Sequence, residues 1–399
     1  MSRRVAVTGV GAVTPLGVGA RTAVERWVAG ESGLQGGVGR CDDFTPTEFM
    51  SRKEARRTDR FSQLAIAAAG EALAEAGFAD GPPLDPDRVG CIIATGIGGI
   101  QSIEEGYDAL REKGSEGVSP LTVPMLMPNA AAGNLALRHG LAGPSHSVAS
   151  ACAAGADAIG TAVRLIQCNE ADAVVTGGSE SALNTLAEAA FASMGATSAS
   201  GISRPFDARR DGFVMGEGAG VLVLEAAESA GKRGQPVLGE VIGYGASSDA
   251  HHITAPEPHG EGAVRAIKRA LQDASVTPAQ VDYVNAHGTS TALNDRAETE
   301  ALEKALGDRA GQIPVSSTKS VIGHTLGAAG AVEAIVTLLA LRDRVAPPTV
   351  NWEEREEGLE LDYVPESRPL ETAETDGVIG ISDSFGFGGH NAVLCLAVR

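Results

Sequence analysis

Short apolar runs alternate along the chain with longer stretches in which apolar residues recur at helical spacing. The short runs are rich in Val, Ile and Leu without polar alternation, which is typical of strands buried on both faces. They cover residues 5–8, 91–94, 173–176, 221–224, 237–242, 281–285, 313–316, 378–381 and 392–397. The helical stretches cover residues 21–28, 59–76, 153–167, 262–273, 296–306 and 326–341. This alternation predicts an α/β protein with helices packed on sheets.

Two of the predicted helices are built from small residues and indicate an internal duplication. Their apolar positions are Ala156, Ile159, Val163 and Ile166 in one, and Ala328, Ala331, Ile335 and Leu338 in the other. Gly and Ala dominate the start of both, which favours two helices buried against each other at close range. The polar stretch 232–236 is the expected seam, so we predict an N-terminal half of residues 1–235 and a C-terminal half of residues 236–399.

Composition narrows the function classes. The 399 residues are 43% hydrophobic and carry a net charge of −19, which disfavours a general nucleic-acid binder because such proteins need clustered Lys and Arg. The five cysteines are scattered without CxxC or His/Cys spacing, so neither a disulfide framework nor a metal site is expected. No signal peptide and no membrane-length apolar stretch is recognised, which predicts a cytoplasmic protein with no membrane partner.

Cys152 is the first candidate for chemistry. It lies where the loop 143–147 leads into the first small-residue helix. The positive end of the helix dipole and the free N–H groups there favour the thiolate, which is the nucleophilic form of cysteine. A buried structural cysteine is the alternative interpretation.

Two histidines in separate downstream segments are the next candidates. His287 follows an apolar strand, at the end where active sites of α/β proteins usually lie. Thr289 and Thr291 project the same way and are suited to binding an amide-bearing chain, or else they cap the next helix. His324 and Lys319 lie in an apolar run, where a cation needs a partner, and Glu333 is the carboxylate available. A purely structural Lys319–Glu333 ion pair remains the alternative.

The glycine-rich segment 383–391 contains two phenylalanines, Phe385 and Phe387. Such a loop can move, and its backbone N–H groups can contribute to an oxyanion hole. The same pattern also fits a tight turn between two strands with packed aromatic rings.

Taken together, these segments identify a resemblance. The chain resembles the β-ketoacyl-[acyl-carrier-protein] synthases of the thiolase superfamily, most closely the synthase II type that elongates fatty acids. The resemblance covers essentially the whole chain and is carried, in order, by VAVTGVGAVTPLG, GPSHSVASACAAG, SRPFDARRDGFVMGEGAG, VNAHGTSTALND, STKSVIGHTLGAAGAVE and SFGFGGHNA.

The resemblance implies a thiolase-like five-layer αβαβα fold of two duplicated βαβαβαββ halves, and a homodimer. It implies a decarboxylative Claisen condensation of a Cys-bound acyl group with malonyl-acyl carrier protein. The products are 3-oxoacyl-carrier protein, CO₂ and free carrier protein. No cofactor is implied beyond the phosphopantetheine that the substrates bear.

The resemblance also implies roles for individual residues. The catalytic set is Cys152, His287, His324 and Lys319, supported by Glu333, and the oxyanion hole is formed by the backbone N–H groups of Cys152 and Phe387. Substrate binding is expected at Thr254, Thr289, Thr291, Ile97, Phe385, Phe387 and Gly388, with Ile97 lining the acyl pocket and Phe387 acting as a gate. The acidic carrier protein is expected to dock on Lys53, Arg56 and Arg57, within the densest basic cluster of the chain.

Three function classes stay open within this resemblance, and the fatty-acid elongation enzyme is the first of them. The chain is also compatible with the catalytic ketosynthase subunit of a type II polyketide synthase, which would form a heterodimer with a chain-length partner. A non-catalytic paralogue is the third alternative, although Cys152 argues against it. His390 stands where many elongation enzymes carry Thr, which leaves the chain-length preference open.

Overall fold

The computed structural model describes residues 3–372 and 377–399. All the predicted strands are present, and most of them are longer than predicted. They are β1 (Val5–Thr14), β3 (Val89–Ala94), β5 (Ala173–Glu180), β6 (Gly218–Ala226), β7 (Gly239–Ser248), β8 (Tyr283–Asn285), β9 (Pro314–Ser316), β13 (Val378–Gly386) and β14 (His390–Val398). The predicted helices are also present, as α1 (Ala20–Val28), α3 (Arg60–Glu75), α7 (Ala154–Gln167), α10 (Glu261–Ala274), α11 (Ala292–Leu306) and α13 (Ala329–Asp343).

The strands hydrogen-bond side by side in an order that repeats. With β4 (Ser145–His146), the N-terminal strands run β4-β3-β5-β6-β1, and the C-terminal strands run β9-β8-β13-β14-β7. In both halves the first three strands of this order are parallel and the last two pairings are antiparallel. The two halves therefore share one topology, which confirms the predicted duplication.

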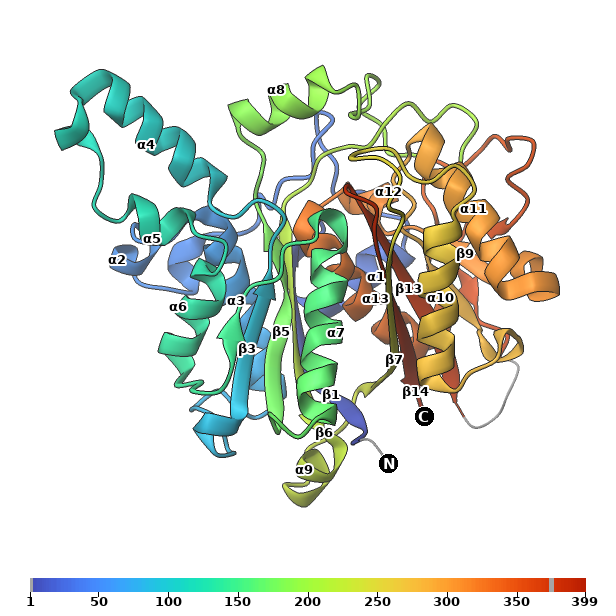
Figure 1. Ribbon diagram of the computed structural model, residues 1–399, viewed down its shortest axis with the longest axis horizontal. Helices are drawn as coiled ribbons and strands as arrows, with labels where there is room; N and C mark the ends of the chain where they lie inside the picture. Colours follow the sequence, from blue (N-terminus) through green and yellow to red (C-terminus); the bar gives the residue numbers. More distant parts are fainter. Residues whose placement is uncertain (1–2, 373–376) are drawn as a thin grey trace.

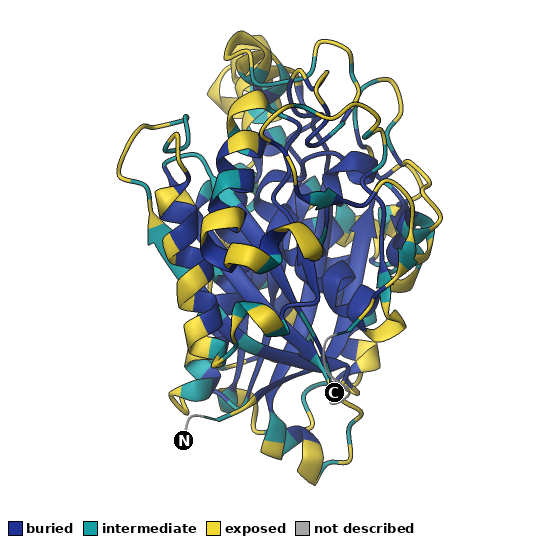
Figure 2. Ribbon diagram, turned by 90° about the vertical axis from the view of Figure 1, so that its right-hand side faces the viewer, coloured by how far each residue is buried: buried dark blue, intermediate teal, exposed yellow. Residues whose placement is uncertain are grey.

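The two half-sheets meet at β1 and β7, which pair only through Ala6 with Glu240 and Val7 with Gly239. Helices α7 and α13 lie between the half-sheets, α3 and α6 (Ala130–His139) cover one outer face, and α10 and α11 cover the other (Figure 1). These are five layers, as the thiolase-like fold class predicts. The strands are buried, and exposed residues gather on the outer helices and loops (Figure 2).

Two glycines let the central helices touch. A Cβ on Gly155 of α7 would lie 2.6 Å from the backbone nitrogen of Ala331, and a Cβ on Gly330 of α13 would lie 2.7 Å from that of Ala156. Any larger residue at either position would push the helices apart. The close approach expected from the small-residue pattern is therefore confirmed, and it brings the N-terminal ends of both helices together.

Several elements were missed by the sequence analysis. They include α2 (Arg52–Ala55), α4 (Ile100–Lys113), α5 (Thr122–Leu126), α6, α8 (Thr185–Ser193), α9 (Ala227–Lys232), α12 (Lys319–Ile322) and the short strands β2 (Gly17–Val18), β4, β10 (Val345–Ala346), β11 (Asp362–Tyr363) and β12 (Arg368–Pro369). Helix α4 buries only Ile100 and Ser102, so it has almost no apolar face to detect. Among the described residues, no helix is both long and apolar enough to cross a bilayer.

The helix contact predicts a difference between two glycine substitutions. Gly155→Ala should lower the free energy of unfolding by about 2 kcal/mol or more, because the new Cβ meets backbone that cannot move aside. Gly133→Ala, inside α6 with open space around its Cβ, should raise the same quantity by up to about 1 kcal/mol. Urea unfolding of both variants measures this, and equal effects would contradict the role given to the helix contact.

Candidate active site

Cys152 lies at the entrance to α7, in a one-turn 3₁₀ helix formed by Ala151–Ala153. The preceding residue, Ala151, has a left-handed backbone with φ of 51°, which turns the chain sharply into the helix. The side chain of Cys152 is buried in a small apolar cluster that includes Phe213, Met215 and Leu326. The predicted position of Cys152 at a helix start is confirmed.

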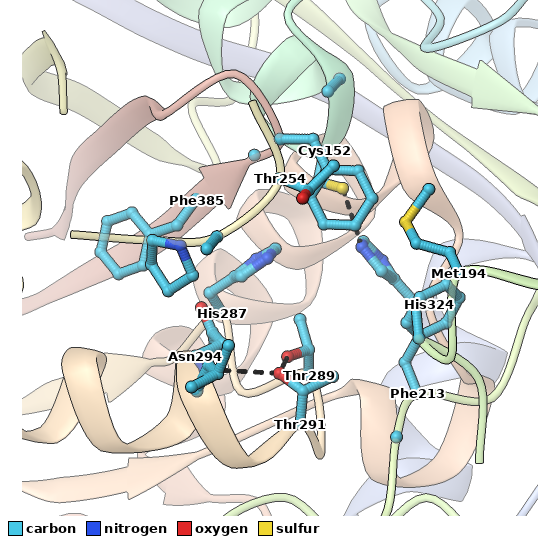
Figure 3. A pocket seen from close by; sticks show the side chains of 18 of the residues that line it. Cys152, Met194, Phe213, Thr254, His287, Thr289, Thr291, Asn294, His324 and Phe385 are labelled. Carbon is cyan, nitrogen blue, oxygen red and sulfur yellow. Dashed lines mark hydrogen bonds between the residues drawn. The ribbon is translucent and has the colours of Figure 1, made fainter. Parts of the chain in front are cut away.

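The ring of His324 lies next to the thiol, with Nε2 at 3.0 Å from Cys152 Sγ (Figure 3). The backbone of His324 is held by Val214, whose carbonyl accepts its N–H at 2.7 Å. The Nδ1 atom accepts the N–H of Leu326 at 3.3 Å, and the ring edge packs on Phe213. Because Nδ1 is an acceptor, the proton of the neutral ring is on Nε2, which points at the sulfur.

His287 approaches from the end of β8 and completes the cluster. Its ring lies 5.4 Å from that of His324, centroid to centroid, at an angle of 84°. The ammonium of Lys319 is 3.3 Å from His287 Nδ1 and also forms an ion pair with Glu333. A donor at Nδ1 again puts the ring proton of a neutral imidazole on Nε2. The structure thus brings together all five residues of the predicted catalytic and supporting set.

Burial sets the charge state of both rings. The pKa of His287 and that of His324 lie well below the usual value, first because the rings are desolvated and then because Lys319 is close. Both imidazoles are therefore neutral near pH 7. Burial also raises the pKa of Glu333. The nearby ammonium of Lys319 acts in the opposite direction and favours the charged carboxylate.

The predicted thiolate at Cys152 is wrong for the resting site. Burial raises the pKa of the thiol to about 11, although Lys319 and the backbone N–H of Phe387 act in the opposite direction. Desolvation outweighs the helix terminus because the sulfur is buried among packed side chains and faces a mainly apolar cavity. Cys152 therefore rests as a neutral thiol, and its reactivity depends on groups that stabilise charge only when it develops.

Among the described residues, Cys152, His287 and His324 form the one group whose side chains are close enough to share a metal ion. The candidate ligand atoms of Cys152, His287 and His324 lie within 4.8 Å of one another. A metal at Nε2 needs a lone pair there and a proton at Nδ1. Lys319 and the Leu326 N–H occupy the two Nδ1 atoms as donors, so the arrangement suits hydrogen-bond donation at Nε2 rather than metal binding.

A mainly apolar cavity of about 570 Å³ opens onto this cluster. Among the predicted substrate-binding residues, its wall contains Ile97, Thr254, Thr289, Thr291, Phe385 and Phe387 (Figure 3 labels four of these). The hydroxyls of Thr289 and Thr291 lie 2.9 Å apart, and Thr291 also caps α11 by accepting the Asn294 N–H. Both interpretations of this threonine pair are thus compatible with its position.

Gly388 does not line the cavity. Its N–H donates to the carbonyl of Ile253 at 2.7 Å, and its φ of 84° forms the turn between β13 and β14. Phe387, one residue earlier, directs its backbone N–H at the sulfur of Cys152. Gly386 faces the backbone nitrogen of Cys152, and a Cβ there would lie 3.0 Å from it. The glycine-rich segment is therefore a tight strand turn that also presents an N–H group to the reactive atom.

The basic residues proposed for docking lie on the surface. Lys53, Arg56 and Arg57 are exposed in and just after α2. Arg60, in the same sequence cluster, is instead paired with the buried Glu217. The surface at α2 thus exposes all three cationic side chains that are predicted to dock the carrier protein.

Two further residues of the site were missed. Glu298 of α11 is buried and accepts the N–H groups of His287 at 2.6 Å and of Gly288 at 2.7 Å, which fixes the catalytic loop. Phe213 packs against His324. Neither has a local sequence signal, because each acts through a contact with a segment far away along the chain.

Comparison with known proteins agrees with this geometry. The family model described as "Beta-ketoacyl synthase, N-terminal domain" matches residues 33–230, and the one described as "Beta-ketoacyl synthase, C-terminal domain" matches residues 238–353. The chain is 44% identical to a 3-oxoacyl-[acyl-carrier-protein] synthase 2 of Synechocystis, over 98% of this chain and 97% of that protein. It is 45% identical to the protein of the same name from Rhizobium meliloti, over 99% and 98%.

Solved structures agree as well, each over the full length of both chains. A β-ketoacyl synthase of Burkholderia phymatum superposes with a TM-score of 0.91 at 35% identity. An ishigamide ketosynthase/chain length factor superposes with 0.92 at 32%. A type II polyketide ketosynthase complex, which contains its acyl-carrier protein and a hexaketide, superposes with 0.91 at 30%. With the duplicated fold and the Cys–His–His cluster, these similarities show that the chain belongs to the β-ketoacyl synthase family.

Proposed function

We propose that this protein is a 3-oxoacyl-[acyl-carrier-protein] synthase of fatty acid elongation, working as a cytoplasmic homodimer without a cofactor. The observation that carries the proposal is the 3.0 Å contact between Cys152 Sγ and His324 Nε2, with His287 beside it in an apolar cavity. A nucleophile next to two neutral N–H donors suits acyl transfer followed by stabilisation of an enolate.

The first step is acyl transfer. The sulfur of Cys152 attacks the thioester carbonyl of an acyl-carrier protein and forms a new thioester. The thiol of the carrier leaves with the proton that Cys152 gives up. The negative charge on the carbonyl oxygen is stabilised by the backbone N–H groups of Cys152 and Phe387, a role supported by the Phe387 N–H being directed at Cys152 Sγ. Since burial opposes the free thiolate, these donors act where the charge develops.

The second step makes the carbon–carbon bond. Malonyl-carrier protein binds, its carboxylate leaves as CO₂, and the electron pair of the broken bond forms an enolate. The Nε2–H groups of His287 and His324 donate to the enolate oxygen. The enolate carbon attacks the acyl-Cys152 carbonyl and the sulfur departs as a thiolate, which yields 3-oxoacyl-carrier protein. The thiolate then takes up a proton from solvent and becomes the resting thiol again. Decarboxylation supplies the nucleophile, so no side chain has to remove a C–H proton.

Different parts of the cavity wall bind the two ends of the substrate. Thr254, Thr289 and Thr291 offer hydroxyls to the amides of the pantetheine arm, and Ile97 contacts the acyl chain. Phe387 gates the passage between these two parts. Lys319 holds His287 in the donor tautomer, and Glu333 balances its charge.

A ketosynthase subunit of a polyketide system is the second candidate. It is favoured by the solved ketosynthase structures that contain a chain length factor or a polyketide carrier protein. The elongation enzyme is preferred because the 3-oxoacyl-[acyl-carrier-protein] synthases are 44–45% identical, against 30–32% for those ketosynthases. Condensation by the purified chain alone supports the first, and a requirement for a partner subunit supports the second.

Removal of the thiol should separate the two steps. Cys152→Ala should form no acyl-enzyme and no 3-oxoacyl product, yet it should still decarboxylate malonyl-carrier protein, because both imidazoles remain. Adding His324→Ala should lower that decarboxylation by roughly 10²–10³, the usual effect of removing one oxyanion donor. Intact-mass spectrometry and CO₂ release measure the two steps. A 3-oxoacyl product from purified Cys152→Ala would contradict the mechanism.

The neutral state of the rings has a consequence for stability. His287 stays uncharged in the folded protein, whereas an unfolded histidine takes up a proton below about pH 6.5. The unfolded state then binds more protons, so stability falls as the pH falls. Between pH 7.5 and 5.5 this costs about 1.4 kcal/mol for the one ring.

His287→Asn should therefore show a shallower loss of stability across this range, by about that amount. Urea unfolding at both pH values measures it. Equal losses in the wild type and the variant would contradict the neutral ring.

The carrier protein should depend on the α2 surface. Reversing charge with Arg56→Glu and Arg57→Glu should raise the Michaelis constant for carrier-bound acyl groups but not for a small acyl thioester. Arg265→Glu with Lys268→Glu makes the same charge change on the exposed face of α10 and is the control. Equal effects on both substrates, or from both variant pairs, would refute docking at α2.

A further inference from the structure

A buried carboxylate outside the catalytic set contacts two segments of the site, the cavity-lining residues Gly96 and Ile97 and the turn that follows His324. Glu180 is the last residue of β5 and is fully buried. It accepts four hydrogen bonds. The Thr95 hydroxyl at 2.8 Å and the Ile97 N–H at 3.3 Å reach one oxygen, and the N–H groups of Gly96 at 2.6 Å and Gly327 at 3.2 Å reach the other. Burial raises the pKa of Glu180, and these four hydrogen bonds act in the opposite direction, because each of them favours the carboxylate.

These donors come from the two halves of the fold. Gly96 and Ile97 belong to the N-terminal half and line the cavity where the acyl chain is proposed to lie. Gly327 belongs to the C-terminal half and is the middle residue of the 3₁₀ turn Leu326–Ala328 that leads into α13. The two backbones are in direct contact, because a Cβ on Gly327 would lie 2.1 Å from the nitrogen of Gly96 and 2.8 Å from Glu180 Oε2. Glu180 therefore fastens the acyl wall to the turn that follows His324.

The turn connects Glu180 to the imidazole through one peptide unit. Leu326 has a left-handed backbone with φ of 48°, so consecutive N–H groups point in different directions. The N–H of Leu326 donates to His324 Nδ1, and the next N–H, of Gly327, donates to Glu180. Movement of Gly327 would shift the donor that keeps the proton of His324 on Nε2.

We propose that Glu180 is a positioning residue that holds His324 in its enolate-binding tautomer and couples it to the acyl wall at Ile97. This inference rests on the proposed function and adds to it a residue that touches neither substrate nor sulfur. An acyl chain pressing on Ile97 acts on the same carboxylate that orients the Gly327 turn. Binding of the acyl chain is thereby coupled to the position of His324, which acts on the malonyl substrate.

The charge of Glu180 provides an independent signature. Three buried charges act on the Cys152 thiol, since Lys319 lowers its pKa while Glu180 and Glu333 raise it. Loss of the Glu180 charge should therefore increase the thiolate fraction even as the His324 turn loosens. A residue with a merely structural role would lower both activities together.

Glu180→Gln is the decisive variant, because an amide must place its NH₂ group against two donors. We expect malonyl-carrier protein decarboxylation to fall by about tenfold or more, while alkylation of Cys152 by iodoacetamide at pH 7.5 becomes faster. Glu225→Gln is the matched control. This buried carboxylate on β6 is paired with Arg233 far from the cavity, and its loss should affect the melting temperature but not the ratio of the two rates.

The outcomes separate the inference from the proposed function. If the wild type does not decarboxylate malonyl-carrier protein, the proposed function fails and this inference fails with it. If the wild type is active but Glu180→Gln lowers both rates equally, or neither, only the role of Glu180 is overturned. Should Glu180→Gln not fold, Thr95→Val removes one donor and keeps the charge. It should lower decarboxylation without raising alkylation, and an unchanged decarboxylation rate would overturn the inference.

Discussion

The contact between α7 and α13 is the constraint on which the site depends. Cys152 enters α7 and His324 precedes α13, so the separation of the two reactive groups is set by how closely these helices pack. Gly155 and Gly330 permit that distance because neither has a side chain to hold the backbones apart. The reactive atoms then lie where two helix N-termini meet, buried beside a mainly apolar cavity. The packing of these two helices therefore determines the geometry of the reactive groups.

Exclusion of water has opposite effects on the two kinds of group. It keeps His287 and His324 neutral, as donors to an enolate require, but it also keeps Cys152 protonated. The buried Lys319–Glu333 pair adds a fixed charge without leaving an uncompensated ion. The site is thus poorly suited to holding charge at rest and well supplied with donors for charge that appears during reaction.

Much of this could be predicted from sequence, and the failures have physical causes. Buried strands and the two small-residue helices have strong local patterns, so their positions and the duplication were correctly predicted. The Cys–His–His cluster was predicted because each of its members lies in a recognisable segment. The pKa of Cys152 was predicted wrongly, because helix position is visible in sequence and burial is not. Helix α4 was missed for lack of an apolar face, and Glu180 and Glu298 because their partners are distant along the chain.

The repeated topology also gives Cys152 a counterpart. Each central helix is entered through a left-handed residue and a single 3₁₀ turn, with Ala151 and Ala151–Ala153 before α7, and Leu326 and Leu326–Ala328 before α13. In this internal pseudosymmetry the middle residue of the first turn is Cys152 and that of the second is Gly327. The fold therefore has two equivalent positions for a nucleophilic side chain. The second is occupied by Gly327, which has no side chain to react. The N-terminal half thus provides the thiol, and the C-terminal half provides both imidazoles.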